Sequence, residues 1–167
     1  MKNNNDIKIR KVTPIDVPGI VGLHRKVVSE TNAKQYNSKV IGEWLSQITP
    51  EKVEKQLKVK TTSWYLIELN TKIIGFCQFP IAKKIIYQLN IDPQYQGKGY
   101  GKTLYRFMEK QFKDSGADKI ELNSTLNALP FYEHLGFRVV RPIKFKLIRS
   151  EMDMLEMVKF LVSNQTL

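Results

Sequence analysis

The stretch LNIDPQYQGKGYGK, residues 89–102, joins a short apolar run to a cluster of three glycines and the start of a long helical pattern. A strand, a glycine turn and a helix start together favour phosphate binding, because the free N–H groups of a helix N-terminus converge there. The helix dipole adds roughly half a positive charge at the same end. Glycine lets the backbone approach a ligand closely and adopt positive φ. The stretch therefore predicts a phosphate-binding loop.

Spacing separates three families of such loops. The dinucleotide pattern G-x-G-x-x-G would need a glycine at position 102, which is Lys102. The P-loop pattern G-x-x-x-x-G-K-[ST] matches Gly101-Lys102-Thr103 but needs a glycine where the chain has Gln96. A shift of one residue redirects the backbone N–H groups, so neither pattern fits. The pattern [QR]-x-x-G-x-[GA] does fit, with Gln96, Gly99 and Gly101.

Residues 89–102 resemble the acetyl-CoA motif of the GNAT acyltransferase superfamily, in which a strand leads into [QR]-G-x-G-[IYV]-G. Further along, LNALPFYEHLGF at residues 126–137 is similar to that superfamily's N-A-x-x-F-Y-x-x-x-G-F helix. The two motifs stand in the family's order and separation, with a helix and a strand predicted between them. The resemblance covers about residues 7–160 and is strongest over residues 85–140.

The patterning of the whole chain predicts one α/β (α+β) domain over residues 1–167, with residues 1–6 disordered. The resemblance implies a mixed central sheet of about six or seven strands, helices on both faces, and a V-shaped gap between the strands near 85–91 and 119–123. The predicted strands lie near 7–12, 64–69, 73–79, 84–91, 119–123, 137–140, 143–148 and 154–160, and the helices near 13–29, 38–48, from 49, 101–115 and 127–135.

In GNAT proteins the pantetheine arm of the cofactor lies in that gap. The resemblance implies acetyl-CoA as co-substrate and no metal, with the backbone of the strand at 84–91 pairing with pantetheine amides and the loop amides holding the pyrophosphate. Asn127 is similar to the family asparagine that hydrogen-bonds the arm, although it could equally cap the short helix. Lys98 and Lys102 either assist as point charges or are solvated surface lysines. The implied cofactor-binding residues are Leu89, Asn90, Ile91, Gln96, Gly97, Lys98, Gly99, Tyr100, Gly101, Lys102 and Asn127.

The family chemistry is direct attack of a neutral amine on the thioester. Tyr132 matches the family tyrosine that protonates the leaving thiolate, and a tyrosine with a pKa of about 10 carries its proton at neutral pH. The alternative is a core aromatic residue beside Phe131. The intact tyrosine favours an enzyme that moves an acetyl group to a primary amine of an acceptor, either a small molecule or a peptide.

The general base is not evident from the sequence. Many GNAT enzymes carry a carboxylate on the strand before the glycine loop, but residues 84–90 contain none. An α-amine acceptor with a pKa near 8 is neutral about a tenth of the time at neutral pH, whereas a lysine-like amine almost never is. A lysine-like acceptor would need Glu68, Glu121, His24 or another acid that the fold brings to the site. The missing carboxylate leaves room for the alternative of a non-catalytic CoA sensor or interaction module.

Tyr36 is the candidate residue for the acceptor pocket. Cys77 is the sole cysteine, which excludes an internal disulfide, and its apolar surroundings predict a buried packing thiol. The chain carries 27 basic and 16 acidic residues, a net charge of +11. The basic residues are scattered, so a solvated surface is favoured over a nucleic-acid site. We expect a cytoplasmic monomer or homodimer without a membrane partner, because no apolar run approaches about 18 residues.

Overall fold

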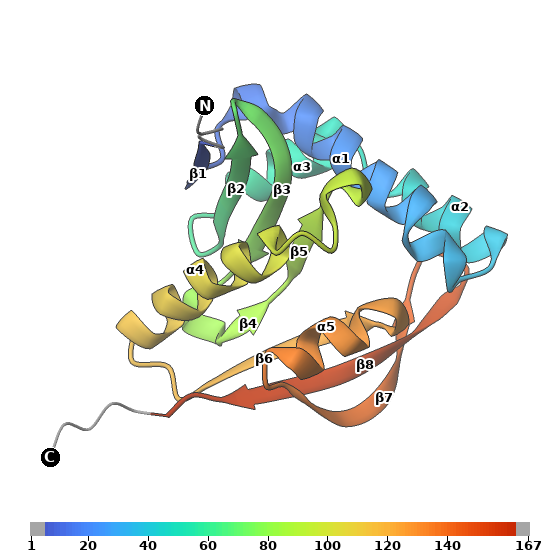
Figure 1. Ribbon diagram of the computed structural model, residues 1–167. Coiled ribbons are helices and arrows are strands. Elements are labelled where there is room, and N and C mark those ends of the chain that lie inside the picture. The colour runs from blue at the N-terminus through green and yellow to red at the C-terminus, as the bar shows by residue number, and fades with distance from the viewer. Residues whose placement is uncertain (1–5, 163–167) are drawn as a thin grey trace, which may run out of the picture.

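The computed structural model describes residues 6–162, which form eight strands and five α-helices (Figure 1). Residues 1–5, predicted to be disordered, lie outside the described residues. Asp6, predicted to be disordered with them, instead exchanges two hydrogen bonds with Asn70. The strands are β1 (Ile7–Lys11), β2 (Ser63–Leu69), β3 (Lys72–Phe79), β4 (Ile85–Ile86), β5 (Gln88–Ile91), β6 (Lys119–Thr125), β7 (Arg138–Lys146) and β8 (Glu151–Phe160), and the helices are α1 (Val17–Glu30), α2 (Ser38–Ser46), α3 (Pro50–Leu57), α4 (Tyr100–Asp114) and α5 (Leu129–His134).

The strands form two four-stranded sheets, where a single sheet of about six or seven strands was expected. The first sheet has the order β1-β2-β3-β5, and all its neighbours are antiparallel. The second has the order β4-β6-β8-β7, with β4 and β6 parallel. The difference arises because the strand expected over residues 84–91 is divided between the two sheets.

This division occurs at Tyr87. The backbone N–H of Tyr87 donates to the carbonyl of Gln78 at 2.9 Å, and Gln88 is the register partner of the same Gln78. Two residues therefore oppose one, which is a β-bulge, and a bulge re-aims a strand. Before it, β4 pairs with β6; after it, β5 pairs with β3. The two strands diverge from there, so the V-shaped gap expected between β5 and β6 begins at the bulge (Figure 1).

The second half of the chain holds one further correction. The two strands expected at 137–140 and 143–148 form the single strand β7, in which Pro142 stays in register with Leu155 of β8. Proline removes a backbone donor and is therefore confined to edge strands. The order of the second sheet places β7 at its edge, where this proline does not end the strand.

Helices cover both faces of the first sheet, as expected (Figure 1). Successive side chains of a strand point to opposite faces, so Phe76 enters the core beneath α1–α3 and Cys77 enters the core beneath α4. The core beneath α4 continues to Ile120 and Met157 of the second sheet, which makes the two sheets one domain. Cys77 is fully buried, which confirms the expected packing thiol, and burial raises the pKa of its thiol.

Strands β3 and β5 approach each other closely at Gly75. A Cβ atom there would lie 2.5 Å from Cδ1 of Ile91 and 2.7 Å from the carbonyl oxygen of Asn90. Contacts that short would force the strands apart, so glycine at this position sets where the backbone of β5 lies.

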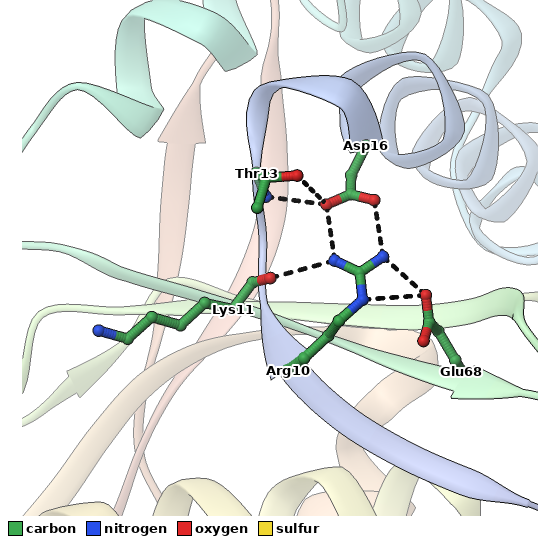
Figure 2. A network of polar contacts seen from close by, with 5 residues as sticks. All are labelled: Arg10, Lys11, Thr13, Asp16 and Glu68. Carbon is green, nitrogen blue, oxygen red and sulfur yellow. Dashed lines mark hydrogen bonds and ion pairs between the residues drawn. The ribbon is translucent and has the colours of Figure 1, made fainter.

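Arg10 ties β1 to β2 and to the turn that precedes α1 (Figure 2). Its Nη1 and Nη2 donate to the two carboxylate oxygens of Asp16, each at 2.8 Å. Its Nε and Nη2 donate to one oxygen of Glu68 at 3.0 and 2.6 Å. The backbone N–H and the hydroxyl of Thr13 also donate to Asp16. The hydrogen bonds from Arg10 lower the pKa of the Asp16 carboxyl to about 2.

Replacing Asp16 with asparagine should lower the free energy of unfolding by about 1–3 kcal/mol, because it leaves Arg10 without its bidentate partner. Because the pKa of Asp16 is lower in the folded state, its contribution to the free energy of unfolding is fully present above the ordinary pKa of 3.8. That contribution is lost as the pH falls toward about 2. The difference between wild type and Asp16→Asn should therefore shrink between neutral pH and about pH 3 in urea unfolding. Asp114→Asn, which removes an exposed ion pair with Lys110, is the control and should change little. A difference that grows on acidification would contradict this account.

Candidate active site

The glycine loop, residues 96–102, connects the end of β5 to the 15-residue helix α4. Gly97 and Gly99 have φ of 73° and 89°, a left-handed conformation that favours glycine. Within the described chain, no backbone N–H of residues 96–102 donates to a protein acceptor; the first helical bond runs from Thr103 N–H to Gly99 O at 3.0 Å. The loop thus presents seven consecutive free N–H groups at the positive end of a helix.

Helix α1 holds the start of this loop and the turn before it in place. Asp92, which follows β5, accepts a hydrogen bond from Gln94 N–H at 2.9 Å. The same carboxylate forms an ion pair with Lys26 of α1 at 2.8 Å. The side chain of Gln96 donates to the carbonyl of Ile91 at 2.9 Å and lies within hydrogen-bonding distance of Thr31 at the end of α1. The expected cofactor residue Gln96 therefore also fixes the loop to the strand.

The free edge of β5 can be assigned from its register. The N–H of Asp92 donates to the carbonyl of Ile74 at 2.8 Å, which continues the pairing of β5 with β3. Backbone groups alternate between the two sides of an antiparallel strand, so those of Leu89 and Ile91 point away from β3. That side is the gap, where β5 has no strand partner. The Ile91 carbonyl already accepts the Gln96 side chain, whereas the Leu89 groups have no such contact among the described residues.

Asn127 and Tyr132 lie in the segment that follows β6. Asn127 is within a 3₁₀ turn, Leu126–Ala128, and its Oδ1 is buried without a hydrogen-bond partner in the described structure. It does not cap α5, which has no side-chain cap. Tyr132 is 7% exposed and packs edge-on against Phe131 and Phe137. Burial raises the pKa of its hydroxyl, so Tyr132 remains protonated at neutral pH.

Tyr36 has a contact that the sequence did not suggest. Its hydroxyl donates to the carbonyl of Asp153 in β8 at 2.7 Å and accepts from Leu126 N–H at 3.0 Å. It therefore joins the helices that cover the first sheet to the second sheet, beside the 3₁₀ turn of Asn127. Its role in an acceptor pocket stays a prediction.

The three expected base candidates have different surroundings. Glu68 is bound to Arg10, and Glu121 pairs with Lys119 at 2.8 Å. His24 lies edge-on between Trp44 and Phe76, and burial lowers the pKa of its imidazole to about 4. Of the three, His24 alone forms no ion pair among the described residues.

A chain of amides lies along the strand before the glycine loop, which carries no carboxylate, as the sequence already showed. Gln88 donates to Gln78 at 2.9 Å, and Asn90 donates to Gln88 at 3.3 Å. Gln78 is 6% exposed, and the sequence analysis did not single it out. A glutamine inside the apolar strand IIGFCQF was the signal that could have found it.

Two further properties concern membrane-spanning helices and metal-binding groups in the described residues. None of the helices in residues 6–162 is long and apolar enough to cross a membrane. The same residues contain no group of three or more His, Cys, Asp or Glu side chains that could hold a metal ion.

A family model described as an acetyltransferase (GNAT) domain matches residues 32–159. The chain belongs to the GNAT acetyltransferase family. Among curated relatives, the uncharacterised N-acetyltransferase YafP of Escherichia coli is 26% identical over 137 residues, which cover 82% of this chain and 85% of YafP. The protein is accordingly an N-acetyltransferase, and the expected GNAT fold is confirmed.

Solved GNAT structures superpose on most of this chain. A GCN5-related N-acetyltransferase from Rhodopseudomonas palustris superposes with a TM-score of 0.85 at 19% identity, covering 92% of this chain and 95% of that one. The PaiA N-acetyltransferase of Thermoplasma acidophilum, solved in complex with coenzyme A, gives 0.74 at 24% identity, covering 93% and 99%. At these identities the likeness establishes the fold alone.

Proposed function

We propose that this GNAT protein transfers an acetyl group from acetyl-CoA to a primary amine. The observation that carries the proposal is the run of seven free N–H groups at residues 96–102, directly after the open edge of β5. Such a cradle at a helix N-terminus suits the pyrophosphate of coenzyme A. Lys98 and Lys102 are exposed beside it and add positive charge.

The rest of the gap also fits the cofactor. The outward N–H and carbonyl of Leu89 and the outward N–H of Ile91 offer strand-like pairing to the amides of a pantetheine arm, while the Ile91 carbonyl holds Gln96. Across the gap, the buried Oδ1 of Asn127 lacks a donor, and an amide N–H of the arm would supply one. A buried unpaired acceptor costs about 1–3 kcal/mol, so binding the arm would recover free energy that the protein alone leaves unused.

Tyr132 is the proposed general acid. Bound acetyl-CoA supplies the activated acetyl thioester, and the C–N bond forms as the C–S bond breaks. Tyr132 would donate its hydroxyl proton to the departing sulfur, while the acceptor nitrogen would lose its proton to solvent, from which the tyrosine regains one. The raised pKa of Tyr132 keeps its hydroxyl protonated at neutral pH. Its hydroxyl forms no hydrogen bond within the described residues that would compete for the proton.

The relatives do not agree on an acceptor. Glucosamine 6-phosphate N-acetyltransferase of Trypanosoma brucei brucei is 44% identical over 48 residues, covering 29% of this chain and 33% of that protein. The bS18-alanine N-acetyltransferase of Haemophilus influenzae is 37% identical over 79 residues, covering 45% and 53%. An amino sugar and a protein alanine are different amines, so the acceptor must be sought in this chain's own pocket.

Coenzyme A should raise the melting temperature, because a ligand bound only by the folded state stabilises it by about 2.7 kcal/mol at a hundredfold excess over Kd. ATP and NAD at equal concentration are the controls and should do much less. Activity is then sought as free-thiol release with polyamines, amino acids, aminoglycosides, amino sugars and peptides. A shift with ATP and none with coenzyme A would favour a P-loop function instead.

A further inference from the structure

A cavity of about 60 Å³ lies beneath α1–α3 on the face of the first sheet that carries the amide chain. It reaches β5 through Gln88, which is next to Leu89 and the open strand edge. The cavity is therefore beside the gap but apart from the glycine loop. Its lining includes His24, Gln47, Lys52, Trp64, Phe76 and Gln88.

Trp64 lines the cavity and carries an unused hydrogen-bond donor. The residue is 5% exposed, and its Nε1 is buried without a partner in the described structure. Buried indole N–H groups usually have an acceptor. Because no protein oxygen serves Trp64, an acceptor atom from a ligand is the natural complement.

The other polar groups of the lining also favour donation. The side-chain oxygen of Gln47 accepts from Lys52, and that of Gln88 accepts from Asn90. Each amide retains N–H capacity beyond these contacts. Lys52 adds a positive charge, and the lining residues include no aspartate or glutamate.

His24 does not change this balance. Burial keeps its imidazole neutral at neutral pH, since its pKa is lowered to about 4. The lining therefore has no negative charge that could bind the second ammonium group of a polyamine acceptor. It has donors and one cation, the set that binds a carboxylate.

We propose that this cavity binds a carboxylate carried by the acceptor, so that the acceptors are amino acids or peptides with a carboxylate near the amine, and not polyamines. The inference rests on the proposed function. A carboxylate in contact with Trp64 and Lys52 would direct the amine past Gln88 toward the gap, where the acetyl group is transferred.

The chain contains two tryptophans and should therefore give two indole N–H signals in a ¹H–¹⁵N spectrum. The signal that is missing in Trp64→Phe belongs to Trp64. The protein is titrated with matched pairs that differ in the carboxylate: L-alanine and ethylamine, L-lysine and cadaverine, L-phenylalanine and phenethylamine. We expect a carboxylate-bearing member of at least one pair to shift the Trp64 signal, with its matched amine leaving that signal in place.

Lys52→Gln, a change at an exposed residue, should weaken the affinity measured in this titration about tenfold, because it removes one charge-assisted contact. Lys58→Gln, at the exposed C-cap of the same helix α3, is the matched control and should leave the affinity unchanged. The proposal is overturned if no carboxylate-bearing compound moves the signal, which would mean that the cavity holds only water, or if the amines move it equally. The readout needs no turnover, so a positive titration without acetyl transfer would count against the proposed function alone.

Discussion

Replacing Tyr132 with phenylalanine should lower kcat by about 10²–10⁴-fold and leave the affinity for acetyl-CoA nearly unchanged. The ring keeps its packing against Phe131 and Phe137, while the proton for the leaving sulfur is lost. The loss should shrink with a thioester of a more acidic thiol, because a better leaving group needs its proton less. Steady-state kinetics and direct titration with acetyl-CoA measure the two quantities separately.

Tyr105→Phe is the matched control for this experiment. Tyr105 is 1% exposed and packs against the same Phe137, so the substitution removes a buried hydroxyl from the same core. Its kcat should stay close to that of wild type. Equal rates for wild type and Tyr132→Phe, with chemistry shown to limit the rate, would reduce Tyr132 to a packing residue.

Replacing Gly99 with valine should weaken coenzyme A binding by about 2–4 kcal/mol, roughly 30- to 700-fold in Kd. A Cβ at this position would meet nothing within 4 Å, so the effect does not come from a clash within the protein. It comes from the φ of 89°, which a β-branched residue rarely adopts. Relief of that strain would turn the loop N–H groups away from one another. Isothermal titration with coenzyme A measures the change.

Gly116→Val controls for strain alone. Gly116 has a φ of 76° with open space around it, and it follows the far end of α4. Its replacement should lower stability comparably and leave the affinity for coenzyme A intact. If folded Gly99→Val bound coenzyme A as tightly as wild type did, the glycine loop would have no part in binding.

The glycine loop and the long helix after it could be predicted because their signals are local. Glycines at fixed spacing, a following helical period and a closing glycine lie within one short segment. The break at Tyr87 could not be predicted, because residues 84–91 have the pattern of one continuous strand. Whether such a run bulges depends on two partner strands distant in the sequence, β3 and β6.

Other features depend on the finished arrangement in the same way. Two strands were expected, at 137–140 and 143–148, and the place of β7 at the edge of its sheet explains why one strand continues through Pro142. The hydroxyl of Tyr36 bridges elements separated by most of the chain. The cavity beside Gln88 is built from α1, α3, β2, β3, β5 and the segment between α2 and α3, and neither its donors nor the unpaired Nε1 of Trp64 has a sequence signature.

The bulge at Tyr87 has a consequence for which molecules can enter the gap. Strand β4 pairs with β6 only at Ile85 and Ile86. After these two residues the chain leaves β6, and the two sheets separate between β5 and β6. A ligand that binds along the free edge of β5 must match the spacing of the peptide groups there, as a neighbouring strand would. A chain of amide units meets that demand, whereas a sugar–phosphate chain does not. Discrimination among nucleotide-bearing donors would then depend on backbone mimicry along β5 as much as on the phosphates held by the loop.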